Sequence, residues 1–126
     1  MTADVFCRFR FEAAHRLANV PLDHKCFRMH GHSYEVIVTV SGEVDPAKGW
    51  VRDYAEIADA FNEEVFAKLD HRNLNELLRF LDGNTTSENL ASWIRGRLAS
   101  RLNLGIEGIR VEIWETRDFG SRVGCP

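Results

Sequence analysis

His-Arg-Leu-Ala-Asn-Val-Pro-Leu-Asp-His-Lys-Cys-Phe-Arg-Met-His-Gly-His, residues 15–32, is the stretch of this sequence that decides the fold. It holds four of the five histidines of the chain, together with Cys26. Apolar and polar residues alternate on both sides of it, which is the period of a β-strand. One face before it carries Val5, Cys7, Phe9, Phe11, Ala13 and His15, and one face after it carries His30, His32, Tyr34, Val36, Val38 and Val40. We therefore predict two strands joined by a loop over residues 18–29.

Three of these histidines are candidate metal ligands. His30 and His32 project from one face of their strand, about 6.5 Å apart along the chain, and His15 joins them if the two strands pair antiparallel. Three neutral imidazoles with an open position are typical of a catalytic zinc site, although iron, copper and nickel also accept imidazole. The alternative is a surface hairpin with scattered histidines. We expect His24, in the loop, to face solvent.

Cys26 admits three roles on the residues alone. As a fourth ligand it would close the coordination shell and make the zinc structural. As a catalytic base or nucleophile it would leave the shell open, and the neighbouring cations of Lys25 and Arg28 would favour its reactive thiolate form. The third role is an inert loop thiol.

Two further places carry candidate chemistry. Asp70 and His71 follow the end of a predicted helix. The histidine there either interacts with the helix dipole or relays protons to Cys26 in a tautomer fixed by the carboxylate. Glu115 shares the parity of the apolar face of its strand. It either emerges into water at the end of the strand or grips the N–H donors of a ligand in bidentate fashion.

Composition restricts the class of protein. The chain has 126 residues, 44% hydrophobic and 28% charged, with a net charge of −3. These values fit one soluble globular domain and argue against general nucleic-acid binding. We find neither a signal-peptide pattern nor an apolar run near the roughly 20 residues that cross a bilayer. Cys7, Cys26 and Cys125 show no paired spacing, so we expect reduced thiols in the cytoplasm, with Cys7 buried and Cys125 frayed.

The periodicity along the whole chain predicts strands and helices in separate groups. The expected strands cover about residues 4–17, 30–42, 109–116 and 121–123, and the expected helices about 53–69 and 85–103. Asp53 with Glu56, and Thr85 with Glu88, resemble capping boxes at the two helix starts. This order indicates a single α+β domain over residues 1–126, with an antiparallel sheet and two helices on one face. Long strands in a small sheet leave unpaired edges, so we expect an oligomer.

Six motifs occur in order over about residues 5–116. They are Phe11-Glu-Ala-Ala-His15-Arg-Leu, His24-Lys-Cys26-x3-His30-Gly-His32-Ser-Tyr34, Gly49-Trp-Val-x-Asp53-Tyr, Leu69-Asp-His71-x-Asn-Leu-Asn75, Thr86-Ser-Glu88 and Glu115-Thr116. Together they resemble the 6-pyruvoyl tetrahydropterin synthase superfamily. The three residues between Cys26 and His30 resemble, more narrowly, its bacterial branch of queuosine biosynthesis, which forms a carboxytetrahydropterin. Pyruvoyl-forming animal enzymes have a longer insert there.

The resemblance implies a tunnelling fold (T-fold), in which strands of several subunits assemble into a barrel, typically in a homohexamer. It implies Zn2+ on His15, His30 and His32, with Cys26 as the residue that abstracts a proton. It also implies that the active site forms between subunits.

The resemblance implies roles for four more residues. Asp70 and His71 match the proton relay. Glu115 matches the carboxylate that anchors the pterin ring and is sometimes grouped with the relay, and Thr86 aligns with a position near the pterin pocket. The candidates to contact the triphosphate are Lys25, Arg28, Arg16 and Arg72.

The implied reaction is that of a carbon–carbon lyase. It converts 7,8-dihydroneopterin 3'-triphosphate to 6-carboxy-5,6,7,8-tetrahydropterin and releases acetaldehyde and triphosphate. The alternative on the same fold is 6-pyruvoyl tetrahydropterin synthesis, which eliminates triphosphate without breaking that bond. An alternative of another class is a non-catalytic module whose structural zinc is held by Cys26 and the three histidines, which leaves Asp70, His71 and Glu115 unexplained.

Overall fold

A five-stranded sheet with strand order β3-β1-β2-β4-β5 forms the centre of the computed structural model, which describes residues 1–124. The expectation for Cys125 lies outside these residues. The strands are β1 (Thr2–His15), β2 (His30–Glu43), β3 (Arg72–Asn73), β4 (Ile109–Trp114) and β5 (Gly120–Val123). Each strand with a sequence prediction ends within two residues of the predicted bounds. The sheet is not wholly antiparallel as predicted, because the two-residue β3, too short to show a period, pairs parallel with β1.

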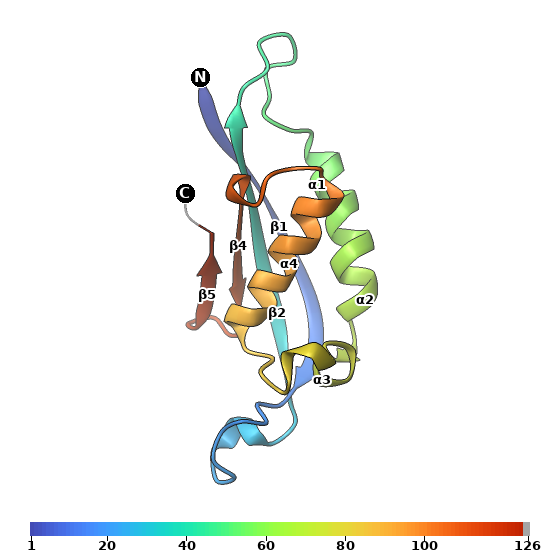
Figure 1. Cartoon of the computed structure of the whole chain (residues 1–126), viewed down its shortest axis with the longest axis vertical. Helices are drawn as coiled ribbons and strands as arrows, with labels where there is room; N and C mark the ends of the chain where they lie inside the picture. Colours follow the sequence, from blue (N-terminus) through green and yellow to red (C-terminus); the bar gives the residue numbers. More distant parts are fainter. Residues whose placement is uncertain (125–126) are drawn as a thin grey trace.

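The helices gather on one face of the sheet, as predicted (Figure 1). The helix expected over about residues 53–69 is continuous and consists of α1 (Tyr54–Phe61), a π-helical turn η2 (Asn62–Phe66) and α2 (Ala67–Leu69). The second expected helix is α4 (Ser87–Arg101). The short elements α3 (Leu74–Leu77), η1 (Lys25–Phe27), η3 (Arg79–Leu81) and η4 (Ile106–Gly108) were not predicted, and the last three are 3-10 turns.

The end of β1 is set by contacts from other parts of the chain. The prediction continued this strand to residue 17, whereas pairing with β2 stops at His15. The backbone N–H of Arg16 donates instead to Oδ1 of Asn75 at 2.9 Å, and that of Leu17 to the carbonyl of Cys26 at 2.8 Å. These two bonds turn the chain out of the sheet and into the loop that projects beyond it (Figure 1).

The helix caps differ in part from the prediction. Asp53 caps α1 as expected, because its side chain accepts from the N–H of Ala55 at 2.9 Å. At α4 the capping residue is Thr86, which accepts from the N–H of Asn89 at 3.3 Å. Thr85 was predicted for this role but is fully buried one residue earlier, where its backbone takes part in the histidine cluster described below.

The core lies between the helices and the face of the sheet that carries the predicted apolar parity. Val36 and Ile94 are among its fully buried side chains. Phe61 of α1 stacks on Phe9 of β1, with ring centroids 4.0 Å apart and planes 6° from parallel. Cys7 packs against this core but is only half-buried, less than expected.

Replacing Phe61 by alanine should lower the free energy of unfolding by about 3–5 kcal/mol, since a buried aromatic ring and its stack are lost. Phe80, which is 63% exposed, provides the control, and Phe80→Ala should change stability by less than about 0.5 kcal/mol. Urea denaturation of the two variants compares these losses. Equal losses would contradict the position of the core.

Candidate metal centre

Three histidines meet at the end of the β1–β2 pair. His15 lies directly opposite His30 in the antiparallel register, and His32 lies opposite Ala13, so all three side chains leave the same face of the sheet. Their ring centroids are 4.6, 4.9 and 5.1 Å apart, and one nitrogen of each lies within 4.8 Å of the others. The predicted convergence is confirmed, and the cluster is close enough to bind a metal ion.

The outer nitrogens of two rings are already engaged. Nδ1 of His15 lies 2.7 Å from the carbonyl of Thr85, and Nδ1 of His30 lies 2.7 Å from the carbonyl of Arg28. A carbonyl can only accept, so each Nδ1 carries the proton and each Nε2 presents a lone pair. Nε2 of His15 and of His32 is buried and has no partner within residues 1–124. A metal ion would satisfy these atoms, and outer hydrogen bonds of this kind are usual for metal-binding histidines.

The protonation state of the cluster also suits a metal. Burial, aided by the charges of His30 and His32, lowers the pKa of His15 to about 4, although its bond to Thr85 acts in the other direction. Burial and His30 lower the pKa of His32 too. Both rings are therefore neutral near pH 7, which is the form that binds metal. Three imidazole nitrogen donors fit Zn2+.

Asn75 and Thr85 hold the His15 end of β1 in place. Asn75 bonds both backbone groups of Arg16, accepting from its N–H and donating to its carbonyl, each at 2.9 Å. The hydroxyl of Thr85 donates to the same carbonyl at 3.2 Å. Neither residue was predicted as part of the site. The only signal was the position of Asn75 in a motif shared with the superfamily.

Cys26 lies in η1, within the loop that joins β1 to β2. Its carbonyl accepts from Leu17, two residues beyond His15, and its N–H donates to Nδ1 of His24 at 3.0 Å. His24 is exposed, as expected. In the described part of the chain, Cys26 does not join the group of close donor atoms formed by the histidines. This arrangement argues against Cys26 as a fourth ligand.

Glu115 lies beside the histidine cluster, just beyond the end of β4. Its side chain is half-buried, with Oε2 3.9 Å from Nε2 of His32. Burial raises the pKa of this carboxyl, and the charge of Glu88 adds to the effect, whereas His30 lowers it. Glu88 is held by the hydroxyls of Ser87 and Ser121, at 3.0 and 3.1 Å. The carboxyl group of Glu115 therefore lies near the metal cluster, where it could accept from the N–H groups of a ligand.

Asp70 and His71 form a hydrogen-bonded pair against the outer edge of β1. Oδ2 of Asp70 accepts from Nδ1 of His71 at 2.8 Å, which fixes the tautomer and raises the pKa of this histidine. Oδ1 of Asp70 accepts from the N–H of Glu12, and the N–H of His71 donates to the carbonyl of Glu12. His71 has a φ of 59°, so its backbone is held in the left-handed region.

Most of the β1 and β2 residues beside His71 belong to the sheet face opposite the histidine cluster. His71 lines a hollow of about 550 Å3 together with Glu12, Gly31 and Ser33, and His32 of the cluster also borders this hollow. Residues 12, 31 and 33 alternate along β1 and β2 with those of the metal cluster, so their side chains leave the opposite face.

The basic residues that are candidates to contact the triphosphate do not lie together in one place. Arg72 lines the hollow beside His71. Lys25 and Arg28 are exposed on the loop around Cys26. The guanidinium of Arg16 stacks over the ring of Phe27, 4.3 Å from its centroid, and so helps to pack this loop.

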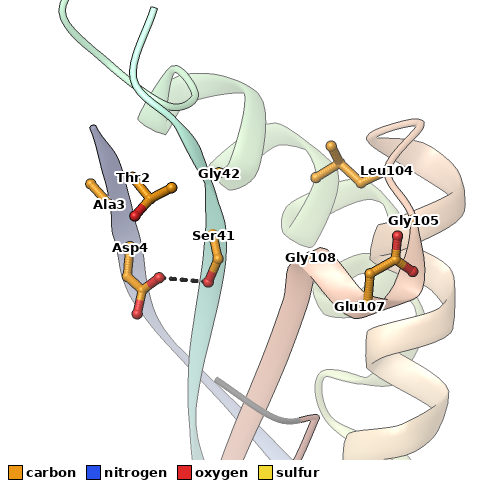
Figure 2. Close-up of a pocket in the computed structure, with 9 residues that line it drawn as sticks. All are labelled: Thr2, Ala3, Asp4, Ser41, Gly42, Leu104, Gly105, Glu107 and Gly108. Atoms are coloured by element: carbon orange, nitrogen blue, oxygen red, sulfur yellow. Dashed lines mark hydrogen bonds between the residues drawn. The ribbon is translucent and has the colours of Figure 1, made fainter.

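A larger hollow of about 750 Å3 lies at the other end of the β1–β2 pair (Figure 2). Asp4 accepts there from the hydroxyl of Ser41 at 2.6 Å. Glu107, in the turn after α4, lines the same hollow. Asp4 and His15 are eleven positions apart in β1, about 36 Å of extended strand. This hollow is therefore no part of the metal cluster.

Comparison with known proteins places these features in a family. The sequence profile described as "6-pyruvoyl tetrahydropterin synthase" matches residues 4–123. The human protein named 6-pyruvoyl tetrahydrobiopterin synthase is 38% identical, over 90% of this chain and 86% of its own. A Pyrococcus furiosus protein named dihydroneopterin monophosphate aldolase is 33% identical, over 95% and 96%. An Archaeoglobus fulgidus protein named putative 6-carboxy-5,6,7,8-tetrahydropterin synthase is 37% identical, over 86% and 84%.

The fold agrees with a solved structure. Caenorhabditis elegans 6-pyruvoyl tetrahydropterin synthase superposes with a TM-score of 0.86 at 29% identity, covering 100% of this chain and 97% of that one. Within residues 1–124, no helix combines the length and apolar character needed to cross a bilayer.

Replacing Asn75 by alanine should weaken zinc binding by about 10–100-fold, because the backbone that carries His15 loses two hydrogen bonds. Competition with a chromophoric chelator measures this affinity. Asn62, exposed in η2, provides the control, and Asn62→Ala should bind zinc like the wild type. An unchanged affinity in Asn75→Ala would show that the strand end needs no such support.

Proposed function

The chain belongs to the 6-pyruvoyl tetrahydropterin synthase family, and on this basis we propose that it is an enzyme that acts on a pterin triphosphate. The proposed reaction is the zinc-dependent conversion of 7,8-dihydroneopterin 3'-triphosphate to 6-carboxy-5,6,7,8-tetrahydropterin, with release of acetaldehyde and triphosphate, in queuosine biosynthesis. The observation that carries this proposal is the cluster of three imidazoles, which leaves Cys26 outside its donor group.

Each residue of the site has a distinct part in this reaction. His15, His30 and His32 hold Zn2+, which supplies a Lewis acid for the hydroxyls of the pterin side chain. Glu115 accepts from the N–H donors of the pterin ring and so orients the side chain toward the cluster. Cys26, as the thiolate, takes a proton from a side-chain carbon, and the cations of Lys25 and Arg28 favour that form.

We propose that the relay comes from a second subunit. Most of the β1 and β2 residues beside His71 belong to the sheet face opposite the imidazoles, which favours a relay that acts at the cluster of another chain. Within the described residues, β3 pairs only with Ala13 and Ala14 on the outer edge of β1, and no strand pairs with the rest of that edge. Pairing of this edge with another copy would build the barrel of a T-fold homohexamer, and such pairing is how sheets commonly cover long edges.

The remaining candidates belong to substrate binding. Thr86 lies at the start of α4, two residues before Glu88, and so near the proposed pterin site. The exposed cations of Lys25, Arg28 and Arg72 are available for the triphosphate, whereas the guanidinium of Arg16 is stacked on Phe27.

The choice between the carboxy and the pyruvoyl product rests on fewer observations. The three residues between Cys26 and His30 and the name of the archaeal relative favour the carboxy product. The name of the human relative favours the pyruvoyl product, which forms without carbon–carbon cleavage. A structural zinc module is disfavoured, since Cys26 lies outside the cluster and the Asp70–His71 pair has no place in it.

Zinc-loaded protein incubated with dihydroneopterin triphosphate should release acetaldehyde and 6-carboxytetrahydropterin in equal amounts, detected by chromatography. Cys26→Ala should lower turnover by at least about 100-fold, because the base is lost, while its zinc content stays that of the wild type. Cys7→Ala is the control and should stay active. A pyruvoyl product without acetaldehyde contradicts the assigned branch, and loss of zinc from Cys26→Ala supports the structural module.

A site shared between subunits should allow two inactive variants to complement each other. Cys26→Ala and His71→Ala, each inactive alone, should recover about a quarter of the wild-type activity when equal amounts form mixed oligomers. Co-purification through two different affinity tags verifies the mixing. Mixed oligomers without activity would place the relay and the thiol of each site on one chain.

A further inference from the structure

Three buried polar side-chain atoms lack a hydrogen-bond partner within residues 1–124, and all three lie in one cluster. They are Nε2 of His15, Nε2 of His32 and the hydroxyl of Tyr34. A bound metal accounts for the two nitrogens but not for the hydroxyl. An unpaired buried hydroxyl is costly, so each such group in a folded protein needs an explanation.

The packing of Tyr34 fixes its ring beside the metal cluster. It is fully buried, stacks on Phe11 with centroids 4.9 Å apart, and meets the rings of His15 and His32 edge-on at 6.0 and 5.4 Å. Tyr34 follows His32 by two residues in β2, so both side chains leave the same face. Its hydroxyl is buried and belongs to a ring that packs edge-on against two of the three imidazoles.

A tyrosine hydroxyl has an ordinary pKa of about 10, so it carries its proton near pH 7. Glu115 lies 3.9 Å from His32, so the carboxyl, the imidazole and the phenol belong to one neighbourhood. A protonated phenol offers one hydrogen-bond donor.

We propose that the Tyr34 hydroxyl donates a hydrogen bond to the oxygen atom of the ligand that occupies the open metal position. Tyr34 then selects ligands with an oxygen acceptor at that place and orients them. If the chain has the proposed function, that atom is a hydroxyl oxygen of the pterin side chain, and only this identification rests on the proposed function. The phenol would become paired only when the ligand is bound.

Tyr34→Phe tests this role, because it removes one oxygen atom and keeps the stack on Phe11. The chain has one other tyrosine, Tyr54, which is 62% exposed, so Tyr54→Phe makes the same chemical change away from the cluster. The first probe is acetohydroxamate, an oxygen ligand of metals, titrated into the cobalt-loaded proteins and followed by visible absorption. Tyr34→Phe should weaken it about 10-fold, a typical loss for a hydrogen bond to a charged ligand. Tyr54→Phe should leave it unchanged.

Two further measurements separate a ligand contact from a structural one. Zinc affinity should be the same in Tyr34→Phe and wild type. The melting temperature of the metal-free protein should be equal or higher in Tyr34→Phe, since an unpaired buried hydroxyl has been removed. A lower melting temperature, an unchanged acetohydroxamate affinity, or no binding of acetohydroxamate to the wild type would each overturn the proposal.

Dihydroneopterin as a second probe distinguishes this inference from the proposed function. If acetohydroxamate weakens in Tyr34→Phe while wild type does not bind dihydroneopterin, the tyrosine contact stands and the pterin function fails. If the wild type binds and converts the pterin triphosphate, but Tyr34→Phe binds acetohydroxamate and dihydroneopterin with the wild-type affinity, the function stands and the tyrosine contact fails.

Discussion

The register between β1 and β2 is the constraint on which the candidate site depends. Because His15 is paired with His30 and Ala13 with His32, three imidazoles leave the sheet on the face that also carries Tyr34 and the core. A slip of one residue would turn the side chains of one strand to the opposite face and separate the cluster. The apolar residues of the same strands prevent that slip, since it would expose them to water. Core packing and metal geometry therefore depend on one pairing.

Contacts from distant parts of the chain complete this arrangement. The carbonyl of Thr85, next to the start of α4, sets the tautomer of His15, and Asn75 replaces the missing strand partner of Arg16. Glu115 arrives from the end of β4. The helices thus do more than cover the sheet, because their first residues fix the metal end of the long strand pair. The same end carries the loop with Cys26, whose backbone is tied to Leu17.

The features predicted well from the sequence are those with a local pattern. A period of two over fourteen residues predicted both long strands and the shared face of the histidines. The positions of Thr85 and Asn75 could not be predicted in this way, because their roles consist of bonds to residues about 60 to 70 positions away. The parallel pairing of β3 was missed for the same reason, since two residues show no period. The left-handed backbone of His71 likewise could not be predicted from the spacing of its neighbours.

An open site of three histidines is tested most directly by X-ray absorption at the zinc edge of the zinc-loaded protein. We predict three nitrogen ligands at about 2.0–2.1 Å and one oxygen ligand, with no sulfur in the first coordination shell. Replacement of Cys26 by alanine should leave that spectrum unchanged. A sulfur ligand at about 2.3 Å in the wild type would place Cys26 on the metal and contradict the open site.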